Sequence, residues 1–396
     1  MKQFWKRAAV AIVSLALLAG MPPAAGAASD EVEVALASMT LREKVGQLFA
    51  VRPEALDFEQ RSGGMKLTCS MREHLRSYPV GGIVLFATNI SSQSQMTALI
   101  RDFQRSAGNS LLVAVDEEGG PVARLANSSA FDLPKFPSAS AIGTTGDPEQ
   151  ARTMGRTIGG YLKPYGFNLD LAPVADVNSN PLNPVIGRRA FSSDPDVTAG
   201  MVRAAVQGFH EAGMLCTLKH FPGHGDTLED SHAGTATSTK TWEEMKAVEL
   251  LPFEAGIAAG ADVVMAAHIT TPNATEDGLP ASLSYTMLTE RLRGELGFTG
   301  VICTDGLGMK AITDHYSPAE AAIAALDAGA DLLLLPADLQ EAFDGVVAAV
   351  ESGRISEERL DESVRRILTL KEKADLSLRA STPADTLLDR LSQLWN

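Results

Sequence analysis

The chain has 396 residues, of which 45% are hydrophobic and 21% are charged, and its formal net charge is −15. This composition is that of a globular protein with a sizeable core, so it excludes an intrinsically disordered chain. The acidic balance excludes nucleic acid as a partner, because binding to phosphates requires a stripe of Lys and Arg, and the sequence holds no such run.

Residues 1–27 differ in composition from the rest of the chain. Lys2, Lys6 and Arg7 precede an apolar stretch at positions 8–19, and small residues follow up to Ala27. This order predicts an N-terminal signal peptide that is cleaved after Ala27. The apolar stretch is shorter than the about 20 residues that a membrane-spanning helix needs, so a retained anchor is the less favoured alternative. We expect a secreted or extracytoplasmic protein without a stable membrane span, with one catalytic domain at 28–396.

Apolar segments of strand type recur through the mature chain, and each ends in polar or Gly-rich residues. There are eight of them, at 45–51, 82–87, 111–115, 167–174, 215–220, 262–268, 300–304 and 331–335. Apolar residues recur with helical spacing between them, at 151–165, 197–212, 242–259, 288–296 and 318–328. Apolar strands that alternate with amphipathic helices are typical of a parallel sheet covered on both faces. The pattern predicts an α/β fold with a single (β/α)8 TIM-type barrel, with a doubly wound open sheet as the alternative.

The end of the chain has the pattern of a helix. Leu360, Val364, Ile367 and Leu368 recur with a spacing of three and four residues. They predict a C-terminal helix that packs on the barrel.

The three cysteines are Cys69, Cys216 and Cys303. Cys216 and Cys303 lie inside apolar runs of strand type. We expect small core residues rather than a disulfide framework.

Polar residues gather where the predicted strands end. The segment DEEGG at 116–120 follows the third predicted strand, and KHFPGHGD at 219–226 covers the end of the fifth strand and the residues after it. The sixth strand ends at His268, and Asp305 directly follows the seventh. The loops at the carboxyl ends of barrel strands converge on one face, and active sites form there. Asp305 is therefore a candidate catalytic carboxylate, and the alternative is an N-cap for the next helix.

The loop after the fifth strand, KHFPGHGDTLEDSH at 219–232, is the most informative segment. Asp230 and His232 are two residues apart, a spacing at which a carboxylate can accept a hydrogen bond from one imidazole nitrogen. That contact fixes the tautomer and raises the basicity of the other nitrogen, which suits an acid/base catalyst near neutral pH. Two alternatives stay open: histidines that only satisfy loop carbonyls, and a metal site formed by His220, His224, Asp226 and His232. We expect no metal, because the end of the first strand lacks the paired histidines typical of metal-dependent barrel hydrolases.

Five motifs together resemble family 3 glycoside hydrolases, in particular the NagZ-type β-N-acetylglucosaminidases. They are DEEGGPVARL, NPVIGRRAF, KHFPGHGDTLEDSH, PASLS at 280–284 and ELGFTGVICTDGLGMKAI. The resemblance runs from about Met39 to Leu370. It implies a retaining mechanism in two displacement steps, with Asp305 as nucleophile, His232 as proton donor and Asp230 as its orienting partner.

The resemblance also implies which residues bind the sugar. Asp116 and Arg124 match positions that bind hydroxyls of the terminal sugar. Arg189 matches the arginine that contacts the ligand near the N-acetyl arm. Lys219 and His220 match the pair that hydrogen-bonds ring hydroxyls.

The activity that this resemblance implies is exo-acting release of terminal β-linked N-acetylglucosamine from peptidoglycan-derived fragments. No metal or organic cofactor is expected. The expected partners are N-acetylglucosamine-containing glycans or muropeptides, and we expect a monomer. Two alternatives remain: a β-N-acetylglucosaminide phosphorylase, and a catalytically silent sugar-binding protein.

Overall fold

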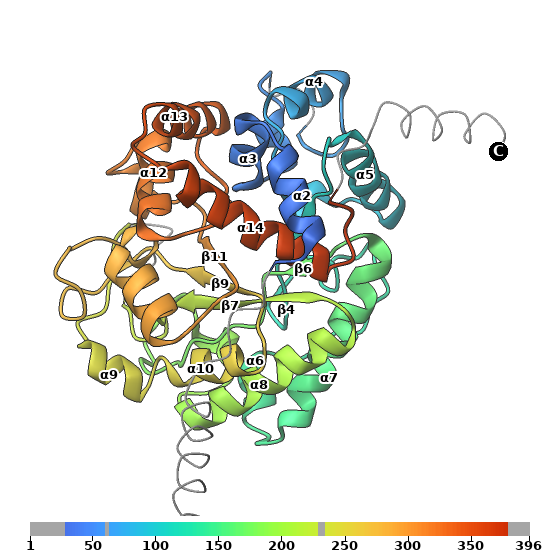
Figure 1. The fold of residues 1–396 in the computed structure, drawn as a ribbon. Coiled ribbons are helices and arrows are strands. Elements are labelled where there is room, and N and C mark those ends of the chain that lie inside the picture. The colour runs from blue at the N-terminus through green and yellow to red at the C-terminus, as the bar shows by residue number, and fades with distance from the viewer. Residues whose placement is uncertain (1–27, 60–62, 229–233, 379–396) are drawn as a thin grey trace, which may run out of the picture.

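A single parallel sheet forms the centre of the molecule. The computed structural model describes residues 28–59, 63–228 and 234–378. The strands of this sheet follow the order β11-β9-β7-β6-β3-β2-β1-β12. Their bounds are β1 Phe49–Val51, β2 Gly82–Leu85, β3 Leu112–Val115, β6 Leu169–Asp170, β7 Leu215–Phe221, β9 Val263–Ala266, β11 Val301–Thr304 and β12 Leu333–Leu334. A parallel bridge between Cys303 and Leu332 brings β11 beside β12, so the sheet is a nearly closed barrel (Figure 1).

Helices surround this barrel (Figure 1). They are α2 Asp30–Ser38, α3 Leu41–Gln47, α4 Cys69–Ser77, α5 Gln93–Ser106, α6 Ala139–Gly143, α7 Pro148–Leu162, α8 Pro195–Glu211, α9 Trp242–Ala247, α10 Leu251–Ala258, the π-helix η6 Thr286–Glu295, α11 Lys310–Thr313, α12 Pro318–Ala328, α13 Leu339–Glu351 and α14 Glu357–Lys373. Short strands add a hairpin of β4 Glu117–Gly119 with β5 Val122–Ala123, and a parallel pair of β8 Ala236–Thr237 with β10 Ile269–Thr270. The predicted (β/α)8 architecture is confirmed, and the open-sheet alternative is wrong.

The strands form where the sequence is continuously apolar. Every residue of the eight barrel strands is buried, because the barrel interior covers one face of the sheet and the helices cover the other. Each of the eight predicted segments overlaps one of these strands. The predicted segments were longer than the observed strands, most of all for 167–174, of which β6 takes two residues, except that β7 extends one residue beyond the predicted 215–220.

Two predicted bounds are wrong. The segment 45–51 begins in α3 and becomes a strand only at Phe49. Thr40 and Glu43 form a capping box that starts α3, so the apolar residues before Phe49 lie on a helix face. The helix predicted at 242–259 is two helices, because α9 ends at Ala247 and α10 begins again at Leu251, just before a proline that cannot donate to a preceding turn.

The predicted C-terminal helix is confirmed and packs across the start of the strands. α14 crosses the middle of the view in Figure 1 and contacts α2, α3 and β11. The buried carboxylate of Asp331, just before β12, accepts hydrogen bonds from Ser363 and Arg366 of α14. Lys373, the last residue of α14, pairs with Asp262 just before β9. α14 therefore covers the amino-terminal end of the barrel, and the loops that follow the strands lie at the opposite end.

All three cysteines are free, and Cys216 and Cys303 are buried in strands β7 and β11. For these two the prediction of small core residues is confirmed. Cys69 is exposed at the first position of α4.

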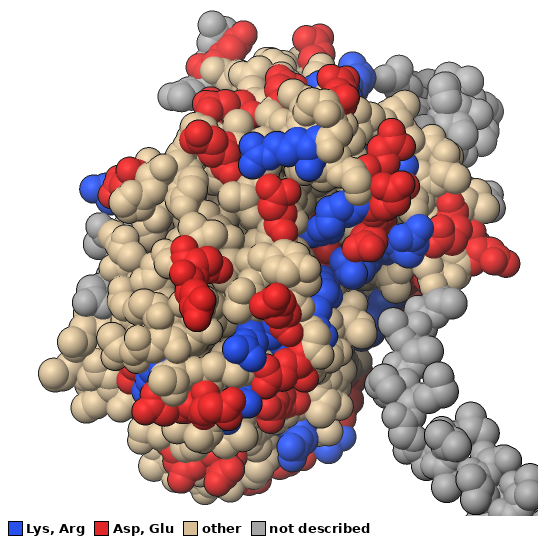
Figure 2. All heavy atoms as spheres, turned by 60° about the vertical axis from the view of Figure 1, so that its left-hand side comes forward, with Lys and Arg blue, Asp and Glu red and all other residues tan. Residues whose placement is uncertain are grey.

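The outer surface carries both signs of charge. On the face drawn in Figure 2, Lys and Arg side chains stand among Asp and Glu side chains. Within the part of the chain that the structure describes, no helix has both the length and the apolar character needed to cross a membrane.

Candidate active site

The loops at the carboxyl ends of the strands enclose a cavity of about 690 Å³. Its wall includes six of the eight residues that the sequence predicted for the site: Asp116, Arg124, Arg189, Lys219, His220 and Asp305. Lys219 and His220 lie near the end of β7, and the other four come from the loops that follow β3, β6 and β11, so the six residues are far apart in the sequence. The barrel therefore brings these six residues together, as active sites of this fold require.

Asp305 directly follows β11 and lies at the cavity wall. Its backbone N–H donates to the carbonyl oxygen of Ala266 at 2.8 Å, and its Oδ1 accepts the N–H of Gly306 at 2.7 Å. The next helix, α11, has Met309 as its N-cap residue. The alternative that Asp305 is an N-cap is therefore wrong, and its carboxylate belongs to the cavity.

Lys219 is buried between two carboxylates. Its Nζ lies 2.7 Å from Oδ1 of Asp116 and 2.7 Å from Oε1 of Glu118. Burial on its own would lower the pKa of Lys219, but the two carboxylates outweigh it and raise the pKa above its ordinary value. Burial would likewise raise the pKa of Asp116, but Lys219 and Arg124 hold it below its ordinary value. Lys219 and Asp116 are therefore both charged at neutral pH.

Glu118 connects Lys219 to Arg189. The Arg189 guanidinium donates from Nε to Oε2 of Glu118 at 2.9 Å and from Nη2 to Oε1 at 2.7 Å, which is a bidentate pair. Burial on its own would raise the pKa of Glu118, but Lys219 and Arg189 lower it to about 2. Glu118 was not predicted as a site residue, although it lies inside the motif that includes Asp116.

The signal for Glu118 was the alternation of the strand. In β4 and the residue before it, Asp116 and Glu118 face the cavity. Glu117 between them accepts the N–H groups of Leu125 and Ala126 instead. Side chains two residues apart lie on the same face of a strand, so the motif could have assigned Glu118 to the cavity.

Arg124 closes the other side of Asp116. Its Nη2 lies 3.4 Å from Oδ2 of Asp116. Its guanidinium lies 5.6 Å from the centre of the Phe86 ring, and that of Arg52 lies 4.7 Å from the same ring. Arg52 and Phe86 also line the cavity, and sequence analysis named neither. Arg52 directly follows the predicted segment 45–51, and Phe86 lies near the end of the predicted segment 82–87, so their place at strand ends was the available signal.

His220 is held from behind by Asp176. Its Nδ1 lies 2.7 Å from Oδ2 of Asp176, and its Nε2 lies 3.4 Å from Nη2 of Arg189. Asp176 is buried in the loop after β6 and was not predicted. The motif that contains it, Ala175-Asp176-Val177, resembles an ordinary buried turn, so the sequence carried no comparable signal.

These contacts form one continuous sequence of alternating charges, which we call the charge chain. Its members in spatial order are Arg124, Asp116, Lys219, Glu118, Arg189, His220 and Asp176. Three carboxylates alternate with three cations, and the imidazole joins the last two. Because each buried charge is paired with an opposite charge or hydrogen-bonded to the imidazole, the side chains are fixed before any ligand arrives.

The remaining predicted residues, Asp230 and His232, lie outside the described residues. The described part of their loop ends at Leu228. Asn183 holds this part, since its Nδ2 donates to the carbonyl oxygens of His224 at 2.7 Å and Thr227 at 2.9 Å.

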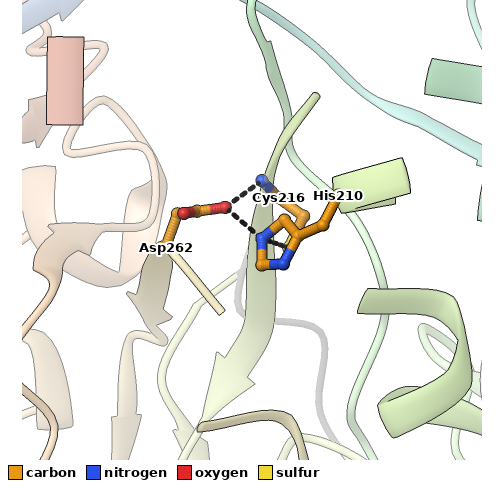
Figure 3. A group of neighbouring side chains, drawn as sticks. All are labelled: His210, Cys216 and Asp262. Atoms are coloured by element: carbon orange, nitrogen blue, oxygen red, sulfur yellow. Dashed lines mark hydrogen bonds and ion pairs between the residues drawn. The ribbon is translucent and has the colours of Figure 1, made fainter. Parts of the chain in front are cut away.

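A different cluster lies at the amino-terminal end of the barrel (Figure 3). Among the described residues, His210, Cys216 and Asp262 are near enough to one another to be considered as metal ligands. The Asp262 carboxylate already accepts from His210 Nε2 at 2.9 Å and from the Cys216 N–H at 3.0 Å, and it also pairs with Lys373. We interpret the cluster as a structural tie between α8, β7, β9 and α14.

A charged cavity at the carboxyl ends of barrel strands defines an enzyme of the (β/α)8 class. The sequence matches the Glycosyl hydrolase family 3 N terminal domain over residues 40–370. The chain therefore belongs to glycosyl hydrolase family 3, as the motifs predicted.

Several relatives are similar over most of this chain. Beta-hexosaminidase A of Pseudoalteromonas piscicida is 36% identical over 358 residues, which are 83% of this chain and 59% of that protein. The beta-hexosaminidase of Stenotrophomonas maltophilia (strain K279a) is 40% identical over 289 residues, 72% of this chain and 84% of that protein. The solved structure of a family 3 beta-N-acetylglucosaminidase from Paenibacillus sp. str. FPU-7 matches with a TM-score of 0.79 and 40% identity, over 85% of this chain and 63% of that one. The chain thus spans less than two thirds of the first and third of these proteins.

The first prediction concerns Glu118. Its folded pKa of about 2 lies below the ordinary 4.5, so the ion pairs of Glu118 stabilise the fold fully above pH 4.5. This contribution is lost as the pH falls toward 2. For Glu118→Gln we expect a loss of about 3 kcal/mol in the free energy of unfolding at pH 7, shrinking below pH 4.5. Urea unfolding at a series of pH values measures both effects.

The control for Glu118 is Glu211→Gln, which removes a solvent-exposed pair with Arg152. Exposed ion pairs contribute at most about 1 kcal/mol. Equal losses for the two variants at pH 7, or a Glu118→Gln loss that does not change with pH, would contradict the assignment.

Proposed function

We propose that this protein is a retaining exo-β-N-acetylhexosaminidase that releases terminal β-linked N-acetylglucosamine. The observation that carries the proposal is one cavity whose wall includes both Asp305 and the charge chain from Arg124 to His220. The family and the beta-hexosaminidase relatives support the same activity. The catalytically silent alternative is disfavoured, because such a protein would be expected to have lost the nucleophile or the Asp-His pair, and Asp305, Asp230 and His232 are all present in the sequence.

The proposed chemistry has two displacement steps. In the first, an oxygen of Asp305 attacks the anomeric carbon, the bond to the leaving oxygen breaks, and that oxygen takes a proton from His232. In the second, a water gives a proton to His232 while its oxygen attacks the anomeric carbon and releases Asp305. Asp230 would hold the imidazole in the tautomer that this exchange requires.

The charge chain supplies donors and acceptors for the sugar. Asp116 and Glu118 keep lone pairs that can accept hydrogen bonds from hydroxyl groups, and Lys219, Arg124 and Arg189 can donate to hydroxyl or carbonyl oxygens. Since these groups already hold one another in place, binding costs little further ordering of side chains. We propose that Arg189 serves the N-acetyl arm and that Lys219 and His220 serve ring hydroxyls.

The proposed substrates are N-acetylglucosamine-containing glycans, including peptidoglycan-derived fragments that a secreted enzyme would meet outside the cytoplasm. Water is the proposed acceptor in the second step. A phosphorylase would instead form the sugar 1-phosphate. Mass analysis of the sugar product with and without added phosphate decides between them.

The nucleophile is tested by Asp305→Ala. We expect the hydrolysis of 4-nitrophenyl β-N-acetylglucosaminide to fall by at least about a thousandfold, because no covalent intermediate can form. The control is Asp314→Ala, at an exposed aspartate that follows α11. Retention of more than a tenth of the activity in a folded Asp305→Ala protein would rule out this nucleophile.

The proton donor is tested by His232→Ala with two substrates. A natural disaccharide has a poor leaving group that needs the proton, whereas 4-nitrophenolate leaves without one. We expect disaccharide hydrolysis to fall by about 10² to 10⁴ and the aryl substrate to lose much less in its first step. Equal losses on both substrates would argue against His232 as the donor.

A further inference from the structure

Asp176 occupies a place in the charge chain that sequence analysis did not foresee. It is fully buried, and it lies behind His220 rather than in the cavity wall. Its Oδ1 accepts the backbone N–H of His224 at 2.7 Å and that of His220 at 3.2 Å, while its Oδ2 lies 2.7 Å from His220 Nδ1. One carboxylate thus holds both the ring and the backbone of the turn after β7.

The charge on Asp176 decides which nitrogen of His220 carries the proton. Burial on its own would raise the pKa of Asp176, but His220 and His224 hold it below its ordinary value, so the carboxylate is ionised. An ionised carboxylate only accepts hydrogen bonds, so His220 Nδ1 must carry the proton. In the neutral ring Nε2 is then an acceptor, and it faces Nη2 of Arg189 at 3.4 Å.

The loop that contains Asp176 also contacts the turn after β7 through a second residue, Asn183. Asn183 donates to the carbonyl oxygens of His224 and Thr227, and its Oδ1 accepts the N–H of Ile186 at 2.7 Å, three residues before Arg189. A Cβ on Gly225 would lie 1.8 Å from the carbonyl oxygen of Val177, so the two loops interlock with no room for a side chain there. The loop after β6 therefore packs closely against residues 224–227 of the loop after β7, and the Arg189 guanidinium contacts Glu118, His220 and the carbonyl oxygen of Val185.

We propose that Asp176 is a positioning residue for substrate binding: it keeps His220 in the Nδ1–H tautomer, so that Nε2 accepts from Arg189 and fixes the guanidinium at the cavity wall. In the other tautomer Nε2 would carry a proton toward the cation and repel it. Arg189 would then be held by Glu118 and by the 3.4 Å hydrogen bond from its Nη1 to the carbonyl oxygen of Val185. This proposal for Asp176 rests on the proposed N-acetylhexosaminidase function only in the choice of substrate for the kinetic test.

The kinetic test compares Asp176→Asn with Asp262→Asn. Asp262 is a matched control because it too is a buried carboxylate that accepts from a histidine ring and a backbone N–H, but at the opposite end of β7 (Figure 3). For Asp176→Asn we expect KM for an aryl N-acetylglucosaminide to rise at least tenfold while kcat changes less. For Asp262→Asn we expect lower stability with an unchanged KM. A general loss of folded protein would lower the apparent kcat and leave KM alone, so an unchanged KM in Asp176→Asn would overturn the proposal.

The second test reads the tautomer directly and needs no turnover. The protein is labelled with ¹⁵N-histidine at pH 8, where an ordinary histidine is neutral. The ring signals of His220 are assigned from their absence in His220→Gln. We expect the Nδ1–H pattern in the wild type and the Nε2–H pattern in Asp176→Asn. An Nε2–H pattern in the wild type would overturn the proposal even if Asp176→Asn fails to fold, and this result is separate from whether the protein hydrolyses the proposed substrate.

Discussion

The site depends on buried charges that neutralise one another at the carboxyl end of the barrel. Asp116 and Glu118 lie beside Lys219 and the two arginines of the charge chain, Asp176 lies beside His220, and the pKa of each of these carboxyl groups is held below its ordinary value. Any one of these charges, buried alone, would cost several kcal/mol. Because they occur together, the barrel can hold a charged cavity whose side chains are ordered without a ligand.

Strand β7 shows how the fold separates stability from function. Its first residues lie in the tie formed by His210, Cys216 and Asp262, which also holds α14 through Lys373. Its last residues, Lys219 and His220, belong to the charge chain. The amino-terminal end of the barrel is thus closed by a helix and ion pairs, and the loops at the other end are held by Asp176 and Asn183. This division is typical of the fold, and it lets the cavity vary while the barrel persists.

The sequence predicted the architecture because buried parallel strands are continuously apolar and alternate along the chain with segments of helical periodicity. It failed for the apolar stretch before Phe49, where a capping box imposes a helix. The six cavity residues were predicted because strand ends converge and because the motifs resemble a family. Glu118 could have been found from strand alternation. Asp176 could not, since its role arises from a contact with His220 across 44 positions, which no local pattern reports.

The central claim is that one sugar ring binds between Asp305 and the charge chain. A crystal structure of the protein with N-acetylglucosamine measures this most directly. We expect the anomeric carbon to lie within about 3.5 Å of an Asp305 carboxylate oxygen, with ring hydroxyls hydrogen-bonded to Asp116 and Lys219. A sugar bound outside this cavity, or one whose anomeric carbon points away from Asp305, would contradict it.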